Sequence, residues 1–286
     1  MSMALDYSPT VRRRRLAAEL RRLREFSGMK LEDVAAYLDC RHPKISRIEK
    51  GRGAVSVGDV RLMLDFYGVT GVEADRLIQL ARDSGKKSWW HSYSDVLPDW
   101  LATYVGLEAE AAECRTYEGE VVNGLLQTHD YATAVTLATV DTPSADEVDR
   151  RVELRLKRQR RLHDEQPLEL HVVHSEAALR RPVGGRAVMS EQLRHLAQLA
   201  ELPNVTVRAL PISAGAHPAM LGPFVMLRFP EASDRDVVYL ETQVGSLYLE
   251  KFDEIADYSR VFDHLCRKAV DPRGTIHLIH RIAKEL

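Results

Sequence analysis

Hydrogen-bond donors and cations gather in one short stretch of this chain, residues 41–52. Planar or forked donors can read base edges in the major groove of DNA, whereas cations and hydroxyls contact phosphates. Ile45 and Ile48 interrupt the polar run three residues apart, so they share one face of a helix and leave the polar side chains outside. The residues predicted to contact DNA are Arg41, His42, Lys44, Ser46, Arg47, Lys50 and Arg52.

A helix that carries these side chains needs neighbours to hold it, and the first 85 residues can supply them. Apolar residues recur there at helical spacing and are interrupted by turn-forming residues such as Gly28 and Gly51. Ala35 is small at the place where the second and third helices would cross closely. The five predicted helices cover residues 10–27, 31–38, 43–50, 56–67 and 73–84.

The order of these elements, and residues 44–51 above all, resembles the helix-turn-helix of Cro/repressor-like bacterial regulators of the xenobiotic-response-element type. The resemblance implies that the third helix enters the major groove and that two copies pair across a two-fold axis. Two positions depart from the family pattern. Asp39 stands where the turn usually has glycine, and Pro43 follows Arg41 and His42 without the usual serine cap. Aspartate tolerates the left-handed backbone conformation better than most residues, so the turn is retained.

The charge of the chain is unevenly distributed. Residues 1–87 hold 18 Lys and Arg against 12 Asp and Glu, a net +6, and the rest of the chain has a net −8. A basic first part on an acidic body is expected when only the first part meets a polyanion. Chance variation along a charged chain, on a plain surface bundle of helices, is the alternative. The arginine run at residues 12–15 has two interpretations as well, phosphate contact or a solvated first turn.

The second part of the chain mixes two periodicities. Helices are predicted at residues 101–114, 125–138, 146–163, 190–202, 253–269 and 275–285. Strands are predicted at residues 168–173, 205–210, 224–229 and 237–241. The predicted fold class is therefore a two-domain chain, with an all-α five-helix head and a larger mixed α/β (α+β) domain. The predicted boundaries are residues 1–85 for the head, 86–97 for a linker and 98–286 for the second domain.

This second part also carries motifs in a recognisable order. They are Tyr117-Glu118, Gly124-Leu125-Leu126-Gln127-Thr128, residues 175–185, Leu210-Pro211 and Gly222-Pro223-Phe224. Together they resemble an actinobacterial domain of unknown function that follows helix-turn-helix heads in WhiJ-like developmental regulators. Ser175 departs from that pattern, because an acidic residue commonly precedes Glu176 in the family. The resemblance implies an antitoxin-like protein with a small partner protein encoded nearby.

Five residues are candidates for binding a regulatory partner. Paired tryptophans are rarely left in water, so Trp89 and Trp90 are expected to dock the linker or line an interface. Glu176, Arg180 and His217 are candidates for one pocket. The Pro and Gly steps after His217 frame a loop that leads into a strand, a common place for binding residues.

The sequence gives little support for catalytic activity. It has no Gly-rich phosphate loop and no nucleophile elbow. His171 and His174 lie three apart on a predicted strand, so they point to opposite faces and do not share a metal. His277 and His280 share a helix face but lack a third close ligand. We therefore expect no cofactor, no metal and no catalytic residue.

The sequence thus predicts a sequence-specific DNA-binding transcriptional regulator that acts as a homodimer on a double-stranded operator. Its second domain is expected to receive a small protein partner or a small-molecule effector. Two alternatives remain: an antitoxin-like protein whose DNA binding is mainly autoregulatory, and an enzyme with an appended helix-turn-helix. Three widely spaced cysteines and the lack of about 18 consecutive apolar residues predict a cytoplasmic protein with no membrane contact.

Overall fold

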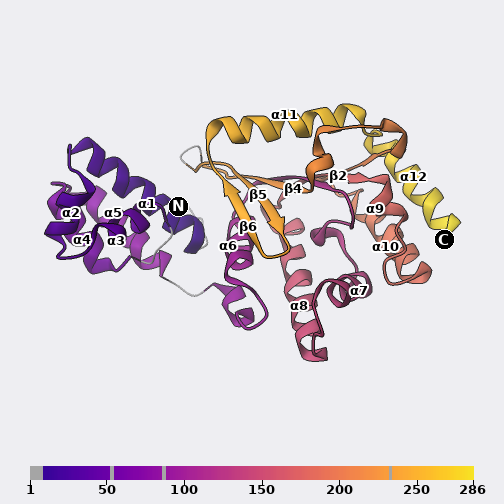
Figure 1. Ribbon diagram of the computed structural model, residues 1–286, viewed down its shortest axis with the longest axis horizontal. Helices are drawn as coiled ribbons and strands as arrows, with labels where there is room; N and C mark the ends of the chain where they lie inside the picture. The colour runs from indigo at the N-terminus through magenta and orange to yellow at the C-terminus, as the bar shows by residue number, and fades with distance from the viewer. Residues whose placement is uncertain (1–8, 52–54, 86–87, 232–233) are drawn as a thin grey trace. The chain divides into compact units, whose positions relative to one another are not determined.

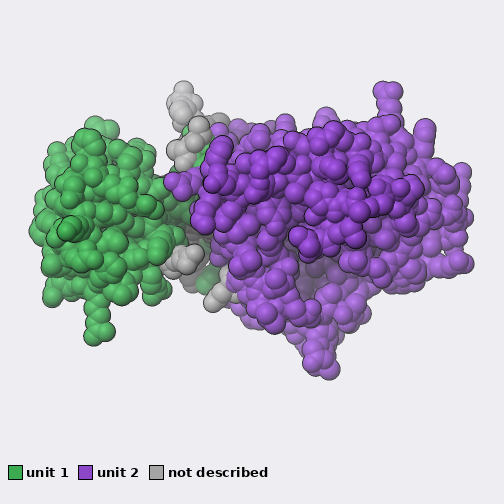
Figure 2. All heavy atoms as spheres, turned by 45° about the horizontal axis from the view of Figure 1, so that its top comes forward, with its two compact units in different colours: residues 1–91, 231–234 green, residues 92–230, 235–286 purple. Residues whose placement is uncertain are grey.

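The computed structural model describes residues 9–51, 55–85, 88–231 and 234–286. Two compact units divide the chain, residues 1–91 with 231–234 and residues 92–230 with 235–286 (Figures 1 and 2). The stretch predicted as a linker, residues 86–97, includes a 3₁₀ helix at Trp89–Tyr93. Trp90, Tyr93, Val96 and Leu97 are buried there, so this stretch is not a plain polar linker.

The first unit contains the five predicted helices in the predicted order. They are α1 (Pro9–Phe26), α2 (Leu31–Tyr37), α3 (His42–Glu49), α4 (Val57–Phe66) and α5 (Gly71–Ser84). Gly28 and Gly51 follow α1 and α3 with φ of 72° and 65°, a left-handed conformation that glycine adopts without strain. Ser56 caps α4, since its hydroxyl accepts a hydrogen bond from the Asp59 amide at 2.9 Å.

One apolar core holds these helices together. Leu16, Leu20 and Leu23 line the inner face of α1, at the helical spacing that the sequence shows. Val34 and Ala35 of α2 are buried in the same cluster, as are Ile45 and Ile48 of α3. The small side chain of Ala35 lies at the predicted place, where α2 and α3 pack together.

The second unit is built on one six-stranded sheet. Its strands are β1 (Glu113–Glu118), β2 (Glu169–Ser175), β3 (Val205–Leu210), β4 (Phe224–Arg228), β5 (Val237–Thr242) and β6 (Gly245–Leu249). In the sheet they follow the order β3-β2-β1-β4-β5-β6. The first three strands are parallel, and the last three pair antiparallel. The mixed α+β class predicted for this part of the chain is therefore confirmed.

Helices cover both faces of the sheet. They are α6 (Asp99–Glu108), α7 (His129–Thr139), α8 (Ala145–Arg158), α9 (Glu176–Arg180), α10 (Arg186–Leu199), α11 (Phe252–Lys268) and α12 (Pro272–Glu285). Figure 1 shows α11 along one face of the sheet, with α7 and α8 on the opposite side. The long α11 buries Phe262 and Leu265 against Tyr117, Val173 and other sheet residues.

Two helix predictions were wrong, and two elements were missed. The helix predicted at 101–114 ends at Glu108, and Glu113–Glu118 forms the central strand β1 instead. The helix predicted at 125–138 is split, because Thr128 caps α7 through a hydrogen bond from the Tyr131 amide. Strand β6 and the short helix α9 were not predicted. In each case pairing or capping outweighed the local apolar pattern.

A buried ion pair joins α6 to α8. The carboxylate of Glu108 accepts two hydrogen bonds from the Arg158 guanidinium, both at 2.7 Å, and a third at 2.7 Å from the Tyr104 hydroxyl. Burial acts to lower the pKa of Arg158, but the charge and hydrogen bonds of Glu108 outweigh it and raise that pKa above its ordinary value. The Glu108 carboxylate is buried, so water cannot replace Arg158 as its partner without a rearrangement.

Replacing Arg158 by Met should therefore leave the Glu108 carboxylate buried and uncompensated. We expect the free energy of unfolding of the second unit to fall by about 3–5 kcal/mol. Urea titration followed by circular dichroism measures it. Arg260→Met is the matched control, because Arg260 pairs with Asp257 at an exposed site on α11 and should change stability little. Equal effects of the two substitutions would contradict this account.

Candidate DNA-binding surface

The helix α3 presents one polar face to solvent. Ile45, Ile48 and Glu49 are buried, whereas Pro43, Arg47 and Lys50 are exposed. These three exposed residues are spaced i, i+4 and i+7, so they lie along one stripe of the helix. An arginine and a lysine in this stripe offer a forked donor and a point charge to a ligand in front of α3.

The turn before α3 has the geometry of a helix-turn-helix. Asp39 adopts a φ of 46°, which confirms that aspartate holds the left-handed position where glycine is usual. Arg41 is the N-cap residue of α3 and makes no side-chain cap hydrogen bond. Pro43 stands in the first turn, where its missing amide costs nothing. His42 is exposed, and its Nε2 lies 3.5 Å from a carboxylate oxygen of Glu32.

A buried ion pair fixes α3 against α1. Arg24 donates to both carboxylate oxygens of Glu49, from Nε at 2.7 Å and from an Nη at 2.9 Å. Its other Nη donates to the Met29 carbonyl at 2.9 Å, in the turn before α2. Glu49 is buried and Arg24 is partly buried, and the bidentate geometry restricts the relative orientation of the two helices. This contact has no signal in the local sequence, because 25 residues separate its partners.

A second contact ties α3 to α4. Lys44 Nζ donates to Asp59 Oδ1 at 3.0 Å. Partial burial acts to raise the pKa of Asp59, but its hydrogen bonds with Lys44 and Ser56 outweigh this and lower the pKa. Lys44 thus already has a carboxylate partner, and a phosphate would have to compete with it.

The predicted DNA-contacting residues fall into three groups. Arg41, His42, Arg47 and Lys50 are exposed at or beside α3, as is the ion-paired Lys44. Ser46 is half-buried, at the flank of the exposed stripe. The prediction for Arg52 lies outside the described residues. In the run 12–15, Arg12 is buried and Arg15 pairs with Asp234 at 2.7 Å within the first unit, so this run is not a plain solvated turn.

Partner-binding candidates of the second unit lie where the parallel strands end. Glu176 follows β2 directly, and its carboxylate accepts from Arg180 at 2.7 Å and from the Ile212 amide, after β3, at 3.1 Å. Arg180 also pairs with Glu285 of α12 at 2.7 Å. In open α/β sheets, ligands bind outside the carboxyl ends of the parallel strands. The structure therefore brings Glu176 and Arg180 together at an edge of that kind.

His217 lies on the loop between β3 and β4. Its ring packs edge-on against Tyr117, near the end of β1, with ring centroids 5.5 Å apart. Burial lowers the pKa of His217, and the nearby charges of Lys268 and His264 lower it further. Among the described residues, no hydrogen bond, ion pair or ring contact joins His217 to Glu176 or Arg180.

The loop at residues 211–223 adds features that the sequence analysis missed. Lys268 of α11 donates to the carbonyls of Ala214, at 3.3 Å, and Ala216, at 3.0 Å. The loop so held exposes the apolar side chains of Ile212, Met220 and Leu221. Glycines and prolines in this stretch signalled a loop, but only the structure shows its exposed apolar surface.

The tryptophan pair belongs to the first unit. Trp89 and Trp90 meet edge to face, with ring centroids 5.6 Å apart and an interplanar angle of 90°. Trp90 is buried and Trp89 is half-buried. The pair is thus held in a fixed arrangement, as expected for aromatic side chains with a packing role.

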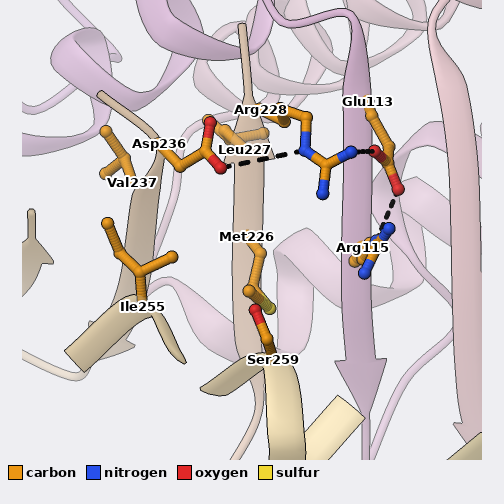
Figure 3. A pocket seen from close by; sticks show the side chains of 9 residues that line it. All are labelled: Glu113, Arg115, Met226, Leu227, Arg228, Asp236, Val237, Ile255 and Ser259. Carbon is orange, nitrogen blue, oxygen red and sulfur yellow. Dashed lines mark hydrogen bonds and ion pairs between the residues drawn. The ribbon is translucent and has the colours of Figure 1, made fainter. Parts of the chain in front are cut away.

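A small pocket lies between the sheet and α11, at the opposite ends of the parallel strands (Figure 3). Its charged groups neutralise one another. Arg228 pairs with Glu113 at 3.0 Å and lies 3.8 Å from Asp236, and Arg115 also pairs with Glu113. Burial raises the pKa of Asp236. With its charges satisfied internally, this pocket has no feature that selects a ligand.

No group of three or more His, Cys, Asp or Glu side chains among the described residues is placed to hold a metal ion. His171 is half-exposed, whereas His174 is buried and accepts a hydrogen bond from the Asn123 amide at 3.1 Å. No described helix is both long and apolar enough to cross a membrane.

Comparison with known families agrees with this geometry. A helix-turn-helix domain matches residues 15–77, and the domain of unknown function DUF5753 matches residues 101–281. No curated protein and no solved structure matches the chain. The chain is thus of the class with a helix-turn-helix DNA-binding domain, which supports a DNA-binding regulator rather than an enzyme. It belongs to the DUF5753 family, whose model covers more than half of its length.

The Arg24–Glu49 pair yields a prediction about α3. Replacing Arg24 by Met should leave the buried Glu49 carboxylate unpaired and lower the free energy of local opening of α3 by about 3–5 kcal/mol. Hydrogen exchange of the α3 amides in the full chain measures this. The control is Arg21→Met. Arg21 lies on α1, as Arg24 does, and pairs with Glu25 on the exposed side of that helix. Unchanged exchange in α3 would show that the pair does not hold it.

Proposed function

We propose that this protein is a sequence-specific DNA-binding transcriptional regulator whose α3 enters the major groove of an operator. The observation that carries the proposal is the exposed stripe on α3 with Arg47 and Lys50, on a helix fixed by the buried Arg24–Glu49 pair. A rigid helix with outward donors meets the requirement for direct readout, since base contacts need side chains held in register with the groove.

Each predicted residue takes a role that its chemistry allows. Arg47 is proposed to read a base, because its fork can donate two bonds to guanine O6 and N7. Arg41 and His42, at the start of α3, are proposed to reach bases as well. Lys44, Ser46, Lys50 and Arg52 are proposed to contact phosphates, which position the helix without reading sequence.

We further propose that the protein binds DNA as a homodimer. One recognition helix covers only a few base pairs, and two-fold symmetry repeats its contacts on an inverted half-site. The half-sites should then be about 34–36 Å apart, or a multiple of this. Such a regulator works on DNA in the cytoplasm, as a repressor in the simplest case.

The second unit is proposed to bind a regulatory partner. The exposed apolar residues Ile212, Met220 and Leu221 support a protein rather than a small molecule, because such a patch would be covered on binding. Glu176 and Arg180 of α9 and His217 of the loop after β3 are proposed to bind the partner as well, and Trp89 and Trp90 are proposed to take part in the coupling. The resemblance to WhiJ-like actinobacterial proteins also supports a small partner, and an antitoxin-like protein that regulates its own operator is the second candidate.

The DNA-binding proposal predicts the effect of replacing Arg47 by Ala. Loss of a bidentate contact should weaken binding to a selected operator by about 1–3 kcal/mol and relax its preference at one base pair. Gel shifts at fixed salt, with an operator selected from random duplexes, measure both effects. Arg21→Ala is the control for losing an exposed arginine elsewhere in the unit. Unchanged affinity and base preference would refute the role of Arg47.

Partner binding predicts that an effector changes operator affinity. A protein recovered from the native host with the full chain should shift that affinity by about 1–3 kcal/mol, the usual size of coupling between two sites. Leu221→Asp should weaken capture of that protein without changing operator binding in its absence, because Leu221 lies on the exposed loop. If the captured protein leaves operator affinity unchanged, the regulatory role fails.

A further inference from the structure

The last strand of the sheet has an open edge. Among the described strands, β6 pairs with β5 and with no other (Figure 1). Its five residues, Gly-Ser-Leu-Tyr-Leu, contain no charge and no proline. Edge strands are usually protected by charged residues, proline or a cover, because their unpaired backbone groups attract another strand. Strand β6 lacks the first two protections. Helix α6 packs against it, and the Tyr248 hydroxyl donates to the Trp100 carbonyl at 2.6 Å, but no backbone hydrogen bond joins α6 to β6 among the described residues.

Hairpin geometry determines which backbone groups point outward. A two-residue turn at Gln243 and Val244 joins β5 to β6, so the flanking Thr242 and Gly245 form a hydrogen-bonded pair. Hydrogen-bonded and non-hydrogen-bonded pairs then alternate along the ladder. The amides and carbonyls of Ser246 and Tyr248 therefore point away from β5, and no backbone partner for them is found in the described part of the chain.

Three exposed apolar side chains lie in and next to β6, among the exposed charged residues Glu241, Glu250 and Lys251. Leu247, at the centre of β6, is 57% exposed. Val244 in the turn before it is 93% exposed, and Phe252 at the start of α11 is 84% exposed. A five-residue ladder alone is a small interface, and these three side chains on each copy add the apolar area that a stable dimer needs.

We propose that the occupant of this edge is a second copy of the chain, paired antiparallel through β6 with the two-fold axis at Leu247. Ser246 then lies opposite the partner's Tyr248, and Tyr248 opposite the partner's Ser246. Both are pairs in which the outward amides and carbonyls meet, so the register satisfies four hydrogen bonds. Leu247 lies opposite Leu247 of the second copy, and the two six-stranded sheets join into one twelve-stranded sheet.

Charge supports a copy of the same chain at this edge. In an isologous contact, each residue of β6 lies opposite a residue of the same strand in the second copy. A charged residue in β6 would therefore bring two like charges close together. Strand β6 has none, and continuing the register places Glu250 beside Val244 rather than beside another acid. The inference rests on the homodimer of the proposed function and assigns its surface to the second unit.

A disulfide tests the register directly. Residues in a non-hydrogen-bonded antiparallel pair have Cα atoms about 4.5 Å apart, within the range of a disulfide. Leu247→Cys, in a chain with Cys40→Ser and Cys266→Ser and with the buried Cys114 kept, should form a covalent dimer under mild oxidation. Leu137→Cys is the matched control, because Leu137 on α7 is 56% exposed. Equal cross-linking of both variants, or none at residue 247, would overturn the proposal.

A second measurement does not depend on a disulfide. Light scattering should give the native chain a mass of two copies, and Leu247→Lys should halve that mass, while Leu137→Lys should not. A native chain that stays monomeric, or a dimer that persists in Leu247→Lys, would overturn the β6 interface. If operator binding still depends on Arg47 in that case, the proposed function stands and only this surface is wrong. If the chain is a dimer but Arg47→Ala leaves its operator binding unchanged, the proposed function is refuted instead.

Discussion

The buried ion pair between Arg24 and Glu49 is the contact on which the geometry of the first unit depends. Helix α3 has only eight residues, too few to be stable without tertiary contacts. Its apolar residues Ile45 and Ile48 hold it in the core, but an apolar contact alone allows sliding and rotation. The bidentate pair and the bond from Arg24 to the Met29 carbonyl remove that freedom. Because the buried Glu49 carboxylate needs Arg24, the outward face of α3 is set by a contact on its inward face.

The second unit uses buried polar contacts to the same end. The loop after β1 is held where Asn123 donates to Glu118 at 2.8 Å and its amide donates to His174 at 3.1 Å. Burial lowers the pKa of His174 to about 3, so its ring remains a neutral acceptor. Burial also raises the pKa of Glu118 to about 7, against the hydrogen bonds from Asn123 and Thr116. These contacts fix the ends of β1 and β2. Glu176, directly after β2, and His217, which packs against Tyr117 of β1, are therefore attached to rigid strands.

Features of the fold and of the site could be predicted from the sequence where residues close together in the chain determine them. Features that depend on contacts between distant residues could not. The helix-turn-helix follows from local patterns, such as the Ile45–Ile48 spacing and Asp39 in the turn, and these were confirmed. The predicted helix 101–114 took in the first two residues of β1, and the rest of that strand was not predicted. Strand β1 is stabilised by its neighbours β2 and β4 in the sheet, which are distant in sequence. The Arg24–Glu49 pair left no local signal at all. In the second unit, the four-residue spacing of Glu176 and Arg180 was visible, whereas the loop around His217 required the fold.

The claim that α3 reads DNA from the major groove is tested most directly by methylation interference on a selected operator. Dimethyl sulfate modifies guanine N7 in the major groove and adenine N3 in the minor groove, so the two grooves are distinguished in one experiment. The account predicts that N7 methylation of a guanine in each half-site blocks the native chain. It also predicts that the Arg47→Ala variant becomes insensitive to that guanine. Interference from adenine N3 alone, or the same guanine interference in Arg47→Ala, would contradict it.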